Sequence, residues 1–254
     1  MNEIYVFLDW SMTISNLIKN NKLNASNFKL FFNALKKLEQ KTLCHVNFVV
    51  VSGCSKNNAL TRFNILQNAF KSVNRLDMFK GVAYEYGAYY LDENNKVFTP
   101  NTQYKLKNLK AITNFVEKNN YKCSPNFKVY VNVETFNGDN LFLDFVNKCK
   151  NEFKNLSFVY YNDNEGVGLD IKNKELTKGK FITWFLQNKQ PPKLIIVGGD
   201  DAEDTKMLVG YNQAPIVFVG FSGTNKIENK NMFLSEKKNV LGIVDSINKL
   251  IKLK

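Results

Sequence analysis

Side chains that can act in catalysis or hold a cation occur at four separate places in this chain. Most of them directly follow short apolar runs that are typical of buried strands. In chain order they are Asp9 with Thr13, Ser52 with Gly53, Lys178, and the acidic cluster Asp200–Asp204. Asp9 could instead be a turn former or a cap, Ser52 with Gly53 an ordinary turn, and the acidic cluster a solvated helix start, so none is decisive alone. Together they offer a nucleophile, a hydroxyl donor, a cation and oxygen ligands for a metal ion.

The elements that must position these groups alternate between strands and helices. Apolar runs of strand length cover 4–8, 46–51, 194–197 and 216–219, and helical spacing covers 28–38, 58–73, 179–186 and 240–250. This alternation predicts an α/β fold with a Rossmann-like, doubly wound parallel sheet. In such a sheet ligands bind beyond the carboxyl ends of the strands, where Asp9, Ser52 and Asp200 are expected to lie.

A second α/β pattern interrupts this alternation. Helical spacing at 106–118 and 140–153 alternates with strand-like runs at 127–133 and 156–161. We therefore expect two domains: a core of residues 1–88 and 165–254, and an inserted α/β cap of residues 89–164.

The composition limits the classes of function. The chain has 254 residues, of which 44% are hydrophobic, enough for a large core. No apolar run approaches the roughly 18 residues of a membrane span, and the amino end does not resemble a signal peptide, so we expect a cytoplasmic protein without a membrane partner. Its four cysteines are scattered, and the single histidine, His45, is expected to be structural.

The net charge of +12 raises the question of nucleic-acid binding. The lysines are spread along the chain among many asparagines, and only Arg62 and Arg75 carry guanidinium groups. This distribution is typical of solvated faces, so we expect no nucleic-acid partner. A basic field would still attract a phosphorylated substrate.

Three further motifs point to one family. Tyr84–Ala88 resembles a segment that leads into a cap, Glu175–Lys180 a lysine motif, and Gly199–Asp204 with Met207 and Leu208 a metal motif. With Asp9 and Ser52 in this order, the chain resembles the haloacid dehalogenase-like (HAD) superfamily. More narrowly it resembles the sugar-phosphatase branch with an α/β cap, which includes Cof-type, trehalose-phosphate and sucrose-phosphate phosphatases.

The resemblance implies Mg²⁺-dependent hydrolysis of a small phosphorylated metabolite, such as a sugar phosphate, by a monomer or homodimer. It assigns Asp9 as nucleophile and metal ligand, with Asp200 and the Ser11 carbonyl as further ligands. Either Asp204 or Asp201 would act on the metal directly or through water. Lys178 and Ser52 would stabilise the phosphoryl group, and Thr13 and Gly53 would contact the substrate. If Asp9 and Asp200 share one Mg²⁺, they must lie within about 8 Å of each other.

The sequence departs from the family at three positions. Ser11 stands where the branch has an Asp that acts as general acid and base, Cys54 where it often has Arg, and Glu203 where Asn is common. Loss of general acid–base help typically costs about 10²–10⁴-fold in rate. Two hypotheses therefore stay open: a phosphohydrolase slowed by Ser11, or an impaired relative that binds a phosphorylated ligand or a protein partner.

Overall fold

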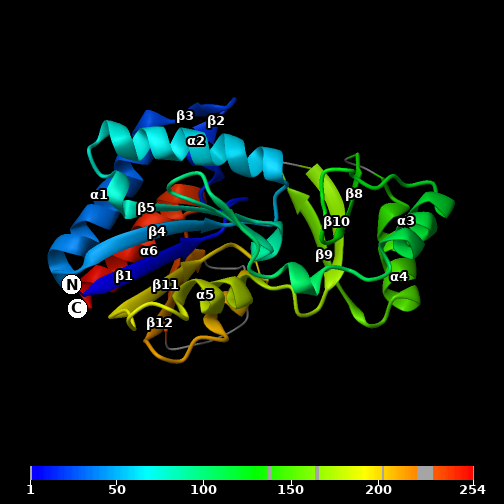
Figure 1. Ribbon diagram of the computed structural model, residues 1–254. Coiled ribbons are helices and arrows are strands. Elements are labelled where there is room, and N and C mark those ends of the chain that lie inside the picture. Colours follow the sequence, from blue (N-terminus) through cyan, green and yellow to red (C-terminus); the bar gives the residue numbers. More distant parts are fainter. Residues whose placement is uncertain (1, 137–138, 164–165, 202, 222–230, 254) are drawn as a thin grey trace. The chain divides into compact units, whose positions relative to one another are not determined.

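The computed structural model describes residues 2–136, 139–163, 166–201, 203–221 and 231–253 (Figure 1). The chain forms two compact units. The larger one comprises the residues up to Pro100 together with those from Thr177 onward, and the smaller one is Asn101–Leu176. The smaller unit is thus an insertion in the sequence of the larger one.

The larger unit contains an eight-stranded sheet. Its strands lie in the order β13 (Met232–Ser235), β12 (Ile216–Phe221), β11 (Leu194–Gly198), β1 (Glu3–Leu8), β4 (His45–Val51), β5 (Phe79–Tyr84), β6 (Tyr89–Asp92) and β7 (Val97–Phe98). Neighbours from β13 to β5 pair in parallel, and β6 and β7 add antiparallel strands at the edge. This topology confirms the predicted doubly wound parallel sheet.

Helices cover both faces of this sheet. α1 (Ala25–Thr42), α2 (Lys56–Ser72) and α6 (Asn239–Lys252) pack on one face, and α5 (Lys178–Leu186) packs on the other (Figure 1). Alternate residues of β1 contact the two layers, since Ile4, Val6 and Leu8 face one and Tyr5 and Phe7 the other. Burial on both faces explains why this strand is apolar from Ile4 to Leu8.

The smaller unit has a three-stranded antiparallel sheet and two helices. The strand order is β8 (Val131–Thr135), β10 (Gly166–Asn173), β9 (Leu156–Asp163), and the helices are α3 (Leu109–Lys118) and α4 (Phe142–Glu152). The insert is therefore α/β, as expected.

The limits of this insert differ from the expected 89–164. β6 and β7 pair with the edge of the larger sheet, so the larger unit continues to Pro100. β10 pairs with β8 and β9, so the larger unit resumes only at Thr177. Both differences arise from strand partners, which the local sequence pattern does not identify.

A small hairpin before α1 was also not expected. β2 (Ile18–Lys19) and β3 (Lys22–Leu23) pair antiparallel around Asn20 and Asn21, both of which have positive φ angles. This conformation suits Asn in a two-residue hairpin turn.

Among the described residues, no helix combines the length and the apolar character needed to cross a membrane.

Candidate active site

The carboxyl ends of neighbouring strands bring Asp9, Ser52 and Asp200 to one edge of the larger sheet. β1 lies between β4 and β11, and its last residue, Leu8, pairs with Gly198 of β11. The Asp9 N–H donates to the Gly198 carbonyl at 2.8 Å, so Asp9 begins its loop tied to the neighbouring strand. The strand register therefore assembles side chains from distant parts of the sequence.

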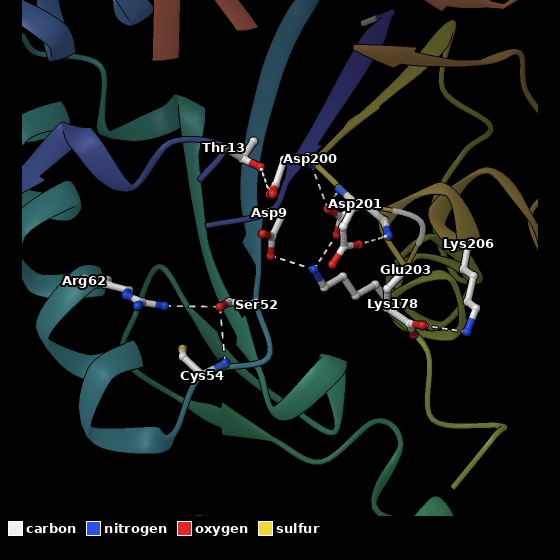
Figure 2. A network of polar contacts seen from close by, with 11 residues as sticks. Asp9, Thr13, Ser52, Cys54, Arg62, Lys178, Asp200, Asp201, Glu203 and Lys206 are labelled. Carbon is white, nitrogen blue, oxygen red and sulfur yellow. Dashed lines mark hydrogen bonds and ion pairs between the residues drawn. The ribbon is translucent and has the colours of Figure 1, made fainter. Parts of the chain in front are cut away.

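A buried lysine joins two of the site's carboxylates. Lys178, the first residue of α5, has its Nζ 2.6 Å from Asp9 Oδ1, as Figure 2 shows. The same Nζ lies 2.5 Å from Asp204 Oδ1. Thr177 caps this helix, since its hydroxyl accepts the Lys180 N–H at 3.3 Å. The Lys180 side chain itself is exposed, so of these two lysines it is Lys178 that faces the carboxylates.

Burial and charge act on Lys178 in opposite directions. Burial lowers the pKa of its ammonium group, but the adjacent Asp204 and Asp9 carboxylates raise that pKa well above its usual range. Burial also raises the pKa of Asp9, and Lys178 opposes this effect. The lysine is therefore a permanent cation, and the ionised form of Asp9 depends on it.

Asp204 is held from two sides. Its Oδ2 accepts the backbone N–H groups of Asp200 and Asp201 at 2.9 and 3.2 Å, while its Oδ1 accepts a hydrogen bond from the Lys178 ammonium group. A Cβ added at Gly199 would lie 2.0 Å from Asp204 Oδ2, so only glycine leaves room for this carboxylate. Most of its accepting capacity is used within the protein, which makes it an organiser of the loop after β11.

The oxygens of Asp9, Asp200 and Asp204 form a group that suits a cation. One oxygen from each lies within 4.8 Å of the others, inside the limit of about 8 Å set above for Asp9 and Asp200. Three carboxylates against one ammonium leave two formal negative charges. Burial, Asp9 and Asp201 raise the pKa of Asp200 to about 7. A divalent cation that prefers oxygen ligands, such as Mg²⁺, fits this donor set.

The loop after β1 contributes Ser11 and Thr13. Thr13 is fully buried, and its hydroxyl donates to Asp200 Oδ1 at 3.0 Å. Ser11 is half-buried, and its carbonyl accepts the Thr13 N–H at 2.6 Å. Asp201 is exposed, with Oδ1 accepting the Asp204 N–H at 3.0 Å. Thr13, for which a substrate contact was expected, thus contacts the Asp200 carboxylate and holds it in place.

Ser52 is linked to Arg62, for which the sequence predicted no role in the site. Its Oγ accepts the Cys54 N–H at 3.2 Å and a guanidinium N–H of Arg62 at 3.1 Å (Figure 2). Gly53 is half-buried, and a Cβ there would lie 3.0 Å from the Tyr86 ring. Arg62 lies in α2, so the sequence motif around Ser52 does not indicate this contact. The one sequence feature that could have drawn attention to Arg62 is the scarcity of arginine in a lysine-rich chain.

His45 lies far along the sheet from these groups. It is the first residue of β4, whereas Ser52 follows the last, so the two stand at opposite ends of one strand. Its Nδ1 is 3.4 Å from Glu39 and 3.7 Å from Asp77. These contacts agree with a structural histidine.

No family model and no curated protein matches the chain by sequence. Solved structures do match it over nearly its whole length. A sugar phosphatase of HAD subclass IIB has 14% identity and a TM-score of 0.62, covering 97% of this chain and 98% of its own. A HAD/Cof-like hydrolase from Plasmodium vivax has 14% identity and a TM-score of 0.60, covering 98% and 96%.

A third match is the sucrose-phosphatase from Synechocystis sp. PCC6803, solved with sucrose and phosphate. It has 11% identity and a TM-score of 0.57, and the alignment covers 98% of both chains. The chain therefore has the fold of the HAD hydrolases, with their Rossmann-like core and an inserted α/β unit. This is the fold that the sequence motifs indicate.

Proposed function

We propose that this chain of HAD fold is a Mg²⁺-dependent phosphohydrolase that acts on a small phosphorylated metabolite. The observation that carries the proposal is the buried Lys178 between Asp9 and Asp204, with Asp200 beside them. Nucleophilic attack on a phosphate ester requires a carboxylate that lies next to a fixed positive charge. It also requires oxygen atoms that can bind a metal cation nearby.

In the proposed reaction Asp9 is the nucleophile. Its carboxylate oxygen attacks phosphorus, the bond from phosphorus to the leaving oxygen breaks, and an aspartyl-phosphate forms. Water then attacks this phosphorus, the bond to Asp9 breaks, and inorganic phosphate leaves. Lys178 neutralises charge on Asp9 and on the phosphoryl oxygens, and Ser52 donates a hydrogen bond to one of them.

The oxygens of Asp9 and Asp200, the Ser11 carbonyl and Asp204 or Asp201 would hold Mg²⁺. The bound ion would offset the repulsion between carboxylate and phosphate. Since most of the accepting capacity of Asp204 is used by Lys178 and two backbone N–H groups, we assign it mainly to positioning. Thr13 would hold Asp200 in the same way.

Proton transfer to the leaving oxygen is the weak step of this scheme. Ser11 carries a hydroxyl where a carboxylic acid would serve as general acid. Ser11 therefore favours a second function, in which the chain binds a phosphorylated ligand or a protein partner with little turnover.

Ser11→Asp separates the two functions. If only the acid is missing, the substitution should raise hydrolysis of alkyl sugar phosphates by up to about 10²-fold. The wild type should meanwhile hydrolyse aryl phosphates far better than alkyl phosphates, because aryl leaving groups need little protonation. Initial rates of phosphate release with Mg²⁺ measure both effects.

A protein that only binds would give another result. Both rates would stay near background in the Ser11→Asp variant, while phosphate would still bind in the presence of Mg²⁺. Rapid wild-type hydrolysis of alkyl phosphates that Ser11→Asp leaves unchanged would contradict both versions, since another residue would then supply the proton.

Stabilisation by Mg²⁺ should depend on pH. In the metal-free chain the pKa of Asp200 is raised from 3.8 to about 7. Between these values the folded state binds more protons than the unfolded state, so this group's contribution to stability falls as pH rises through that range. Mg²⁺ needs the carboxylate form. The increase in Tm on adding Mg²⁺ to EDTA-treated protein should therefore be larger at pH 8 than at pH 6.

The control for this experiment is Asp200→Asn, which removes the titrating group. In that variant the Mg²⁺ effect on Tm should be small at both pH values. Equal stabilisation of the wild type at both pH values would argue against Asp200 as a ligand.

The substrate class is proposed by analogy. The sucrose-phosphatase match contains sucrose and phosphate, and a second match is a sugar phosphatase, so sugar phosphates are the first compounds to screen. The expectations of a monomer or homodimer, of a cytoplasmic location and of no nucleic-acid or membrane partner remain predictions.

A further inference from the structure

Arg62 lies between two residues of the candidate active site. Its guanidinium group donates to Ser52 Oγ at 3.1 Å, and its central carbon lies 4.6 Å from the centre of the Trp10 ring. Ser52 follows β4, and Trp10 is the residue next to Asp9. In Figure 2 the guanidinium points from α2 toward Ser52, on the opposite side of Asp9 from Lys178.

The bonds at Ser52 fix the direction of its proton. A hydroxyl group has two accepting lone pairs and one donor. One lone pair accepts the Cys54 N–H, and the other accepts a guanidinium N–H of Arg62. The proton of the Ser52 hydroxyl can then be donated to a further acceptor. At this edge of the sheet that acceptor can be a phosphoryl oxygen. Arg62 therefore orients the Ser52 donor as well as adding charge.

The ring beneath Arg62 restricts its geometry. Trp10 is 3% exposed and forms a flat surface against which a planar guanidinium can stack. A guanidinium has five N–H donors in a rigid fork that matches two oxygens of a phosphate group. A lysine would keep the charge but would lose both the fork and the stacking.

Position 54 lacks such a cation. Cys54 occupies the position directly after Gly53, where the sugar phosphatases that the chain resembles often have Arg, and its backbone N–H donates to Ser52 Oγ. The helix that follows supplies the guanidinium from a different place in the sequence.

We propose that Arg62 is a phosphate-binding residue of this chain, clamped by Trp10 and Ser52 so that its fork engages the phosphoryl group of the substrate. The inference rests on the proposed function for the identity of the ligand. It adds that the phosphoryl group is bound between two fixed cations, Lys178 on one side of Asp9 and Arg62 on the other.

The test measures binding of inorganic phosphate with Mg²⁺ by isothermal titration calorimetry, and in parallel kcat/KM with an aryl phosphate. Arg62→Ala should weaken phosphate binding by about 10–10²-fold, since hydrogen bonds to charged groups contribute that much. Arg62→Lys should give a smaller loss. Lys71→Ala is the matched control, because it removes an exposed cation from the same helix and should bind phosphate like the wild type.

Guanidinium ion provides a readout that a merely structural role would not affect. Added at millimolar concentration, it should partly restore phosphate binding by the Arg62→Ala variant and leave the wild type unchanged. Alanine favours helix, so α2 should persist in this variant. If that variant does not fold, as judged by circular dichroism, the comparison of Arg62→Lys with Lys71→Ala decides.

Three results would overturn the inference. The first is phosphate binding by Arg62→Ala as tight as that of the wild type, and the second is no phosphate binding by the wild type. The third is a loss of phosphate binding in Arg62→Ala that guanidinium does not restore and that Arg62→Lys shows in full. Failure of the proposed hydrolysis looks different. If the wild type binds phosphate through Arg62 but hydrolyses no ester, the inference holds and the reaction does not.

Discussion

Asp9→Asn is expected to reduce hydrolysis of phosphate esters by at least about 10³-fold, because the amide cannot form the covalent intermediate. The fold should survive, since Lys178 keeps Asp204 as a partner when Asp9 loses its charge. Phosphate release measures the loss. Acid quenching with a radiolabelled substrate should trap a phosphorylated protein for the wild type and none for the variant.

Asp144→Asn is the control for this substitution. Asp144 is an exposed carboxylate in α4 of the smaller unit, so its replacement changes the net charge equally and leaves Asp9, Lys178 and Asp204 unaltered. If Asp9→Asn hydrolysed aryl phosphates at the wild-type rate, Asp9 would not be the nucleophile and the proposed reaction would be wrong.

Lys178→Ala should also have a large effect, about 10²–10³-fold on kcat/KM, because it removes a fixed charge aimed at the reacting group. The variant should in addition be less stable, since it leaves the buried Asp9 and Asp204 carboxylates without their cation. The steady-state kinetics and the Tm of the same preparation report the two effects separately.

Lys180 offers a control two residues away on the same helix. Its side chain is exposed, so Lys180→Ala should be nearly silent in both measurements. Addition of Mg²⁺ should partly recover the Tm of Lys178→Ala without recovering its rate. Equal effects of the two lysine substitutions would mean that the lysine motif has been aligned incorrectly.

The central strands and their helices could be predicted because burial on two faces leaves a continuous apolar run. Ile4–Leu8 is such a run, and its partner β11 has the same character, as has β4 from Phe48 to Val51. The carboxyl ends of these strands then indicated where Asp9, Ser52 and Asp200 would meet. These positions depend only on local burial and on the general geometry of parallel sheets.

Other features depend on partners that are distant in the sequence. β10 has strand character from its sequence, but only its pairing with β8 and β9 assigns it to the smaller unit. The contact of Arg62 with Trp10 joins α2 to the loop after β1, which no spacing rule connects. The hairpin turn at Asn20 and Asn21, by contrast, has a local signal, because asparagine readily adopts the positive φ angles of such a turn.

The stacking of Arg62 on Trp10 also gives the chain an optical probe at its site. The fluorescence of an indole ring responds to charge near its face, and this ring is adjacent to Asp9. The chain contains two tryptophans, and the second, Trp184, lies in α5 near Phe98 and Phe181. Replacing Trp184 with Phe would leave Trp10 as the sole indole emitter, so that occupancy of the site could be followed in real time without a labelled ligand.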